Sequence, residues 1–173
     1  SVTNEHLTPI GQDVPLTDIV KVTDNLNPNE SYYVIGSVMN AETGEALIDK
    51  ETGKPIEVRK DFTTTAENYN NITVNVDFSV DTVDFVEGDA TTNTLKTTKM
   101  VCFERLYAAD GTLIAVHEDL KDENQTIAIV APTLHTTLID VASNSHRGSL
   151  GTAVVIRDKV DYENASVGTT YTF

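Results

Sequence analysis

Cysteine, long apolar runs and helix signals are all scarce in this chain of 173 residues. The single cysteine, Cys102, excludes an internal disulfide, a Cys-x-x-Cys redox pair and a thiolate-rich metal site. No apolar run approaches the roughly 20 residues that a membrane-spanning helix needs, so no membrane insertion is expected. The residues after Ser1 lack a signal-peptide pattern, and we therefore interpret the sequence as a soluble, mature fragment.

Basic side chains are scarce as well. Lysine and arginine together number 12 against 27 acidic residues, which gives a formal net charge of −15. Such a chain has little with which to neutralise phosphates, so nucleic acid is excluded as a partner. An anionic membrane surface is excluded on the same electrostatic ground. Because 39% of the residues are hydrophobic, the chain can still bury a core and is not expected to be disordered.

What the sequence does contain is strand-like patterning. Apolar and polar residues alternate strictly over residues 72–80, which predicts a strand that buries Ile72, Val74, Val76, Phe78 and Val80 on one face. Further strands are predicted at residues 32–39, 99–107, 112–117 and 126–130.

Turn residues separate these strands. Asp110-Gly111 lies between two of them and is typical of a tight hairpin turn. Thr43-Gly44 and Thr52-Gly53 show similar turn chemistry. Many short strands joined by such turns predict an all-β fold, with the strands packed as a β-sandwich.

An internal repeat organises the chain. Residues 10–20 align with residues 150–160, so that Asp18 matches Asp158 and Val20 matches Val160. A period of about 140 residues fits tandem domains better than a solenoid. We therefore expect one nearly complete module at residues 1–131 and the opening strands of a second at residues 132–173.

The incomplete second module has a consequence for packing. An incomplete sandwich exposes unpaired strand edges, which natural proteins avoid. The tail is therefore expected to pack on the first module, to be donated to a neighbouring chain, or to belong to a larger protein.

One strand carries an acid where an apolar residue is expected. Glu104 ends the apolar run Val101-Cys102-Phe103, and a buried carboxylate is costly unless it is paired or protonated. A polar loop that begins at His117 and runs to Thr126 follows the next predicted strand. This strand and loop are the candidate functional region.

No metal or cofactor site is predicted. His6, His135 and His146 are too dispersed along the chain to indicate a zinc site. The sequence has no Gly-rich phosphate loop and no Gly-x-Ser-x-Gly elbow. A conventional enzyme is therefore the least expected class.

The candidate region resembles a known family, the Val-x-Phe-Glu (VaFE) repeats and ester-bond-forming stalk domains of Gram-positive surface adhesins. The resemblance covers the whole chain. Three motifs carry it: Val101-x-Phe103-Glu104, then His117-x-Asp119-x-x-Asp122-x-x-Gln125-Thr126, then Pro132-Thr133-Leu134-His135-Thr136-Thr137. It implies an Ig-like β-sandwich at the bacterial cell surface, anchored to the cell wall, with at most a single-turnover, autocatalytic cross-linking reaction and no cofactor.

The resemblance also implies the roles of individual residues. Members with the His, Asp and Gln motif join a threonine to a glutamine through an ester bond. Gln125 would then be the acyl donor, and His117 the base that takes the hydroxyl proton. Asp18, Glu104 and Asp122 would be the supporting acids.

The sequence identifies the threonine that would form the ester bond less clearly than it identifies Gln125. In the repeat register, the first module's own nucleophile falls before Ser1. Thr136 is the threonine in the family's sequence context, and a bond from Thr136 to Gln125 of a neighbouring chain is ranked first. Thr3 is ranked second, and an unlinked chain third. The expected partners are therefore neighbouring repeats or neighbouring chains, while the sequence identifies no host ligand.

Other interpretations remain open at this level. A Lys–Asn isopeptide-bonded, pilin-like module catalysed by Glu104 is one, although the Gln125 motif speaks against it. A ligand-binding adhesin domain is another, but only 6% of residues are aromatic and the turns are short. Taken singly, His117 fits a surface histidine, Glu104 a cross-strand partner of a lysine or arginine, and Asp18 the end of a turn.

Overall fold

The structure is a computed structural model that divides into two compact units, Ser1–Val130 and Ala131–Phe173. Its described residues are 6–24, 26–89, 94–148, 150–151, 153–165 and 170. Within them, strands dominate and one short 3₁₀ helix, η1 (Thr82–Phe85), is the sole helical element, so the all-β prediction is confirmed. No helix in this described part is long and apolar enough to cross a membrane.

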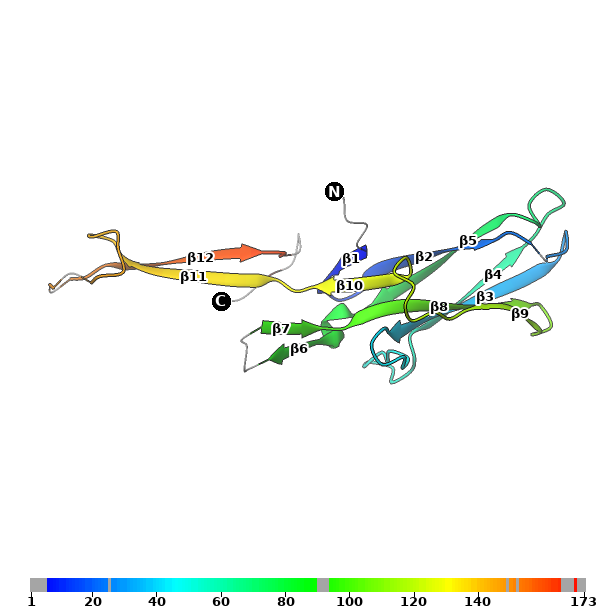
Figure 1. Ribbon diagram of the computed structural model, residues 1–173, viewed down its shortest axis with the longest axis horizontal. Coiled ribbons are helices and arrows are strands. Elements are labelled where there is room, and N and C mark those ends of the chain that lie inside the picture. The colour runs from blue at the N-terminus through cyan, green and yellow to red at the C-terminus, as the bar shows by residue number, and fades with distance from the viewer. Residues whose placement is uncertain are drawn as a thin grey trace. The chain divides into compact units, whose positions relative to one another are not determined.

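The first unit contains one large sheet (Figure 1). Its strands follow the order β1 (His6–Pro9), β10 (Thr126–Val130), β8 (Lys99–Ala108), β3 (Ser31–Asn40) and β4 (Glu57–Thr63). The short strand β9 (Leu113–His117) also pairs with β8. All of these pairs are antiparallel except β1 with β10, which is parallel.

Two smaller ribbons complete this unit. Strand β2 (Val14–Val22) pairs antiparallel with β5 (Ile72–Val80) over nine residue pairs, and β6 (Val86–Asp89) pairs with β7 (Thr94–Thr97). The core lies between the β2–β5 ribbon and the large sheet. Its buried side chains are Val14, Leu16, Leu26, Tyr32, Val34, Val38, Leu47, Val74, Val76, Phe78, Val80, Met100, Cys102, Leu106 and Ile129.

Several strands lie where the sequence predicts them. Strands β5 and β10 have the predicted bounds, β8 and β9 differ by one residue at one end, and β3 is longer by one residue at each end. Residues 74, 76, 78 and 80 are buried as predicted, and Ile72 is partly buried. The Asp110-Gly111 hairpin is also confirmed, because it joins the antiparallel pair β8 and β9 and Gly111 has a φ of 90°.

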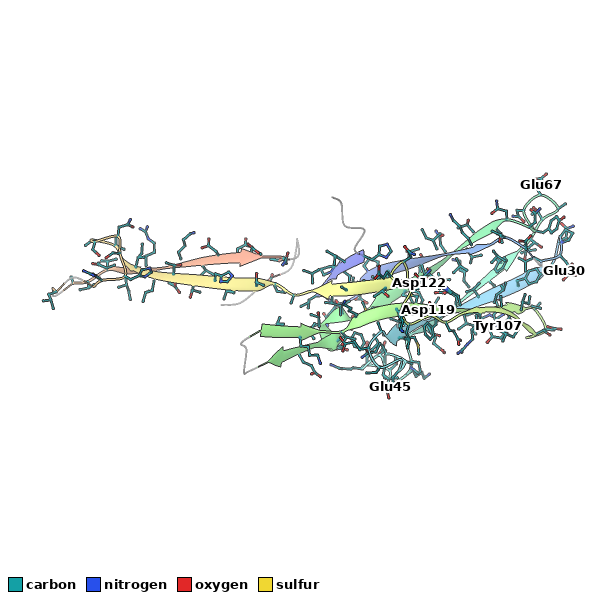
Figure 2. All side chains as sticks on the ribbon, viewed as in Figure 1. Glu30, Glu45, Glu67, Tyr107, Asp119 and Asp122 are labelled. Atoms are coloured by element: carbon teal, nitrogen blue, oxygen red, sulfur yellow. The ribbon has the colours of Figure 1, made fainter. Side chains whose placement is uncertain are left out.

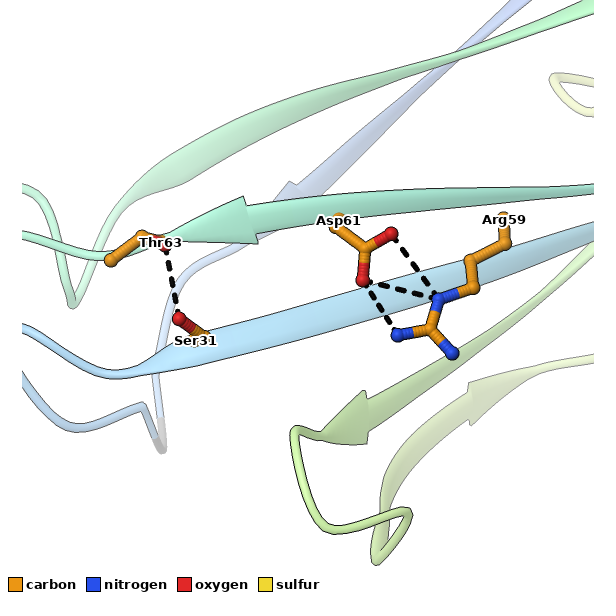
Figure 3. A network of polar contacts seen from close by, with 4 residues as sticks. All are labelled: Ser31, Arg59, Asp61 and Thr63. Atoms are coloured by element: carbon orange, nitrogen blue, oxygen red, sulfur yellow. Dashed lines mark hydrogen bonds and ion pairs between the residues drawn. The ribbon is translucent and has the colours of Figure 1, made fainter.

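Strand β4 was not predicted, because its sequence is mostly charged. Its outer face carries polar contacts (Figure 3): Ser31 Oγ of β3 lies 3.1 Å from Thr63 Oγ1, and Arg59 Nη2 lies 2.6 Å from Asp61 Oδ1 within β4 itself. The Arg59 guanidinium also stacks 3.6 Å above the ring centre of Tyr33 on β3, a cation–π contact. On the inner face, Val58 and Phe62 are partly buried and pack against the core, and the charged residues between them hide this apolar alternation in the sequence.

Gly36 lets the two layers approach closely. It lies in β3 directly opposite Glu104 of β8. A Cβ atom at this position would lie 2.8 Å from Cζ of Phe78 and 3.0 Å from Cγ1 of Val76, both on β5. Real Cβ atoms do not approach so closely, so the β5 side chains pack directly on the β3 backbone and need a glycine there.

The Gly36→Ala substitution is therefore expected to overpack the core and to lower the free energy of unfolding by about 1–3 kcal/mol. Urea unfolding followed by tyrosine fluorescence measures this. The matched control is Gly88→Ala in β6, where an added Cβ meets no atom within 4 Å. Equal stability of the two variants would contradict the close-packing account.

The second unit is a hairpin. Strand β11 (Thr133–Asp140) pairs antiparallel with β12 (Ile156–Glu163) over eight residue pairs, and Thr136 lies opposite Val160. His146 Nδ1 lies 2.9 Å from the carbonyl oxygen of Leu138, and Asp140 bridges to Ser145 at the end of β11. This unit therefore offers two paired strands on which side chains alternate between the two faces.

Candidate functional site

Two strands share one edge of β8, and this arrangement creates the site. Strand β10 pairs with residues 99–101, and β9 pairs with residues 104–107. His117 at the end of β9 lies opposite Glu104, while the Gln125 carbonyl accepts a hydrogen bond of 3.2 Å from the N–H of Cys102. His117 and Gln125 therefore lie beside neighbouring inward-facing positions of one strand.

The loop between β9 and β10 is held by its own hydrogen bonds. Asp119 Oδ1 accepts from the N–H of Lys121 at 2.9 Å, and Asp122 Oδ1 accepts from the N–H of Asn124 at 2.8 Å. The Thr126 hydroxyl donates to the Asp122 carbonyl at 2.8 Å. Figure 2 labels Asp119 and Asp122 on this loop. These bonds leave Asp122 Oδ2 available to a neighbouring side chain.

His117 lies between two acids. Its Nδ1 is 3.2 Å from Glu104 Oε2, and its Nε2 is 3.2 Å from Asp122 Oδ2. The protonated ring donates to both carboxyl groups, whereas the neutral ring keeps one proton and offers the other nitrogen as an acceptor. The side chain is 48% exposed, so a reacting group can reach it. An ion pair also joins Arg105 of β8 to Glu118, the residue that follows β9.

Glu104 faces a second acid, Asp18 of β2, across the core. The two residues are only 5% and 8% exposed. Glu104 Oε1 and Asp18 Oδ2 find no hydrogen-bond donor elsewhere among the described residues, so they can satisfy each other only when a proton lies between them. This layout links the two layers through a pair of carboxyl groups.

Burial, followed by the hydrogen bond to Asp18 and the negative charges of Asp18 and Asp122, raises the pKa of Glu104 to about 9. Glu104 is therefore neutral near pH 7 and donates its proton toward Asp18. The Cys102 thiol is nearby but unreactive, because burial and then the charges of Asp18 and Glu104 raise its pKa to about 12. Cys102 is a small residue of the core.

Two open grooves meet at Gln125. One, of about 540 Å³, runs between the second half of β2 and β9, and both Glu104 and His117 line it. The other, of about 490 Å³, runs between β2 and the strands β1 and β10, and Asp18 lines it. Gln125 lines both grooves, so its carboxamide lies where an incoming group can meet the acids and the histidine.

The structure brings five of the predicted site residues together: Asp18, Glu104, His117, Asp122 and Gln125. The alternative in which Glu104 pairs with a lysine or arginine is wrong, and Asp18 lies within a strand instead of ending a turn. Thr136 is exposed on β11 in the second unit. Thr3 lies outside the described residues.

Apart from Asp18, the contribution of β2 to the site was not predicted from the sequence. Ile19 and Lys21 line both grooves, and Val20 and Val22 line the first. The alternation of Leu16, Asp18, Val20 and Val22 was a readable signal, because an acid on an otherwise apolar strand face marks a position turned toward the core.

Comparison with known families decides the assignment. The family model described as the T-Q ester bond containing domain matches residues 1–129 and 132–173. The chain belongs to the T-Q ester bond domain family. This is a family of structural domains rather than enzymes, typical of the stalks of Gram-positive surface proteins. A search of curated proteins finds no match to the chain.

The proton on Glu104 predicts a pH dependence of stability for this T-Q domain, best measured in Gln125→Ala chains, which lack the carboxamide expected to form an ester bond. Between the ordinary carboxyl pKa of 4.5 and about 9, the folded state holds a proton that the unfolded state has lost. Stability should therefore fall as pH rises through this window, by at most about 1.4 kcal/mol per pH unit.

The additional substitution Glu104→Gln keeps a neutral side chain at every pH. It should therefore remove the contribution of Glu104 to the dependence of the unfolding free energy on pH. Urea unfolding at a series of pH values compares the two chains. Glu67→Gln, at an exposed acid, is the matched control and should keep the parent profile. An unchanged slope in the Glu104→Gln chain would contradict a buried proton at this position.

Proposed function

We propose that the chain is a structural stalk or fibre module of a bacterial cell-surface adhesin, cross-linked by an autocatalytic Thr–Gln ester bond. The observation that carries the proposal is the grouping of Glu104, His117, Asp122 and Gln125 at an open groove. The fold is interpreted as an Ig-like sandwich of the VaFE type, which the packing of the β2–β5 ribbon against the large sheet supports.

The reaction joins a threonine hydroxyl to the side-chain carbonyl carbon of Gln125. Neutral His117, whose Nε2–H donates to Asp122, takes the hydroxyl proton at Nδ1 as the new C–O bond forms, and then returns it to the departing amine. The C–N bond breaks, and one ammonia leaves for each ester formed. The Asp122 carboxylate beside Nε2 orients the ring and stabilises its charged form.

An amide is a poor electrophile, so its carbonyl needs polarisation in a water-poor site. A neutral Glu104 has one proton, and in the reaction this proton turns from Asp18 to the oxygen on which charge develops and donates a hydrogen bond to it. Folding or docking then supplies the proximity, which is worth on the order of 7–11 kcal/mol.

The first-ranked nucleophile is Thr136 of a neighbouring chain. Thr136 is exposed, and Leu134 and Leu138 lie two residues away on either side. A bond from this threonine to Gln125 of the next chain makes a covalent fibre, so a pulling force passes through covalent bonds instead of strand hydrogen bonds. Thr3 is the second-ranked donor. An internal bond of this kind, closing a loop of roughly 100 residues, would stabilise the module by about 4–5 kcal/mol, by analogy with a disulfide.

A Lys–Asn isopeptide bond is the alternative that one observation favours. Lys21 and Asn124 both line the second groove. Glu104, the expected catalyst of such a bond, lines the other groove and has its partners in His117 and Asp18. The ester bond is therefore favoured. Hydroxylamine treatment distinguishes the ester from the isopeptide bond, because hydroxylamine cleaves esters but not amides.

The ester bond predicts a ladder of covalent multimers on denaturing gels, each bond lighter by one ammonia in the intact mass. Peptide mapping should join Gln125 to Thr136, and hydroxylamine should collapse the ladder. Gln125→Ala should abolish the bond, and His117→Ala should slow its formation by roughly 100-fold or more. Asn124→Ala, the matched control, should leave the ladder intact.

Two outcomes discriminate further. If the monomer is lighter than the unlinked chain by one ammonia, and stays so in the Thr136→Val chain, the bond is internal and comes from another threonine. An unmodified monomer mass in the unsubstituted chain, or a hydroxylamine-resistant link at Asn124, would contradict the Thr–Gln proposal.

A further inference from the structure

Two turns of the chain share one sequence and one backbone conformation. Glu-Thr-Gly occurs at residues 42–44, the Gly44 turn, which directly follows β3, and again at residues 51–53, the Gly53 turn. In each turn the glycine N–H donates a hydrogen bond of 2.8 Å to the carbonyl oxygen four residues earlier. Gly44 and Gly53 both have a left-handed φ, of 74° and 67°. The second turn is therefore a close copy of the first.

The two turns differ in what lies against the glycine. A Cβ atom on Gly44 would lie 3.0 Å from Cδ1 of Leu120, whereas a Cβ atom on Gly53 would meet no atom within 4 Å. Leu120 belongs to the loop between β9 and β10, on which Figure 2 labels Asp122. It is the only apolar residue among residues 118–125, and its side chain is packed well enough to leave it only 36% exposed. The loop therefore has a single apolar anchor, and this anchor rests on the Gly44 turn.

The Gly44 turn is a firm support because it is bound to β8. The Ala41 N–H donates a hydrogen bond of 2.9 Å to the Lys99 carbonyl oxygen, at the start of that strand. Within the turn, the side chain of Asn40 accepts hydrogen bonds from two backbone N–H groups. Because β8 also carries Glu104, the contact of Leu120 with this turn fixes the loop relative to the buried acid of the site.

The anchored loop in turn places the Asp122 carboxyl group. Leu120 lies two residues before Asp122, whose N–H donates back to the Asp119 carbonyl oxygen at 3.2 Å. The Asn124 N–H holds Asp122 Oδ1 at 2.8 Å, while Oδ2 lies 3.2 Å from His117 Nε2. One carboxylate oxygen thus belongs to the loop and the other to the ring, so a displacement of the loop changes the contact with His117.

The contact with Asp122 decides where the neutral His117 ring carries its proton. That proton lies either on Nε2, toward Asp122, or on Nδ1, toward Glu104. A hydrogen bond to a charged carboxylate is stronger than one to a neutral carboxyl group, and Glu104 is the neutral member of the two. Asp122 therefore keeps the proton on Nε2 and leaves Nδ1 free to act as a base.

We propose that Leu120 is a positioning residue: seated on the Gly44 turn, it holds Asp122 against His117 and thereby selects the ring tautomer that is protonated at Nε2. The inference rests on the proposed function for the use of this tautomer, in which Nδ1 takes the hydroxyl proton. The tautomer itself can be measured in Gln125→Ala chains, where no ester chemistry at that position takes part.

Nitrogen-15 NMR of the histidine rings, at a pH where they are neutral, tests the proposal. In the full chain carrying Gln125→Ala, His117 should show a protonated Nε2 and an unprotonated Nδ1. The further substitution Asp122→Ala defines the signals of a ring that has lost this partner. Leu120→Ala should move the His117 signals at least half of the way to that limit, whereas Leu120→Met, which can still reach the turn, should restore them. His146, in the second unit, is the internal reference.

The Gly53 turn supplies the matched control for the contact itself. Gly44→Ala and Gly53→Ala strain two similar left-handed turns alike, but only Gly44→Ala pushes against Leu120. Gly44→Ala should therefore shift the His117 signals, and Gly53→Ala should leave them unchanged. In a chain that already carries Leu120→Ala, Gly44→Ala should add no further shift, because the contact is already absent.

Ester formation in chains that keep Gln125 separates the two proposals. Leu120→Ala should slow it by roughly 10-fold or more, because the reacting groups are less well aligned. Shifted His117 signals in the Leu120→Ala chain, without an ester in any chain, would leave the positioning role standing and contradict the proposed function. Unchanged His117 signals in the Leu120→Ala chain, equal shifts in the Gly44→Ala and Gly53→Ala chains, or an ester that forms at the parent rate in the Leu120→Ala chain would each overturn the positioning role.

Discussion

The site depends on a single buried proton held between Glu104 and Asp18. These two carboxyl groups come from different layers of the fold and meet in the core, where two negative charges would repel each other and lose their hydration. One proton removes the repulsion and supplies the missing hydrogen bond. Gly36 opposite Glu104 lets β5 pack close to the large sheet, so the layers stand near enough to share that proton.

The remaining parts of the site follow from the way β8 is paired. Because β9 and β10 occupy successive stretches of one edge, the chain must leave and rejoin that edge beside Glu104. His117 stands where it leaves and Gln125 where it rejoins, and the Asp122 loop spans the interval. The proposed base, acyl donor and neutral acid are thereby held side by side along one strand, β8, which is the preorganisation that a single-turnover reaction requires.

Local patterning predicted the strands better than it predicted the site. The alternation from Ile72 to Val80 is a local property, and β5 has the predicted bounds. Strand β4 was missed because charged residues lie between Val58 and Phe62, its two apolar residues that face the core. The grouping of His117 with Gln125 came from a motif, but the meeting of Asp18 with Glu104 depends on packing between layers that no local pattern encodes.

The central claim is that the Gln125 carboxamide is consumed, and the chain offers a direct test because it has only two glutamines, Gln12 and Gln125. A chain labelled with ¹⁵N at its glutamine side-chain amides should give two NH₂ signals by NMR when it is freshly unfolded and unlinked. After folding and assembly, the account predicts that the Gln125 signal disappears and labelled ammonia is released, while the Gln12 signal remains. Persistence of both signals in the folded, assembled protein would contradict it.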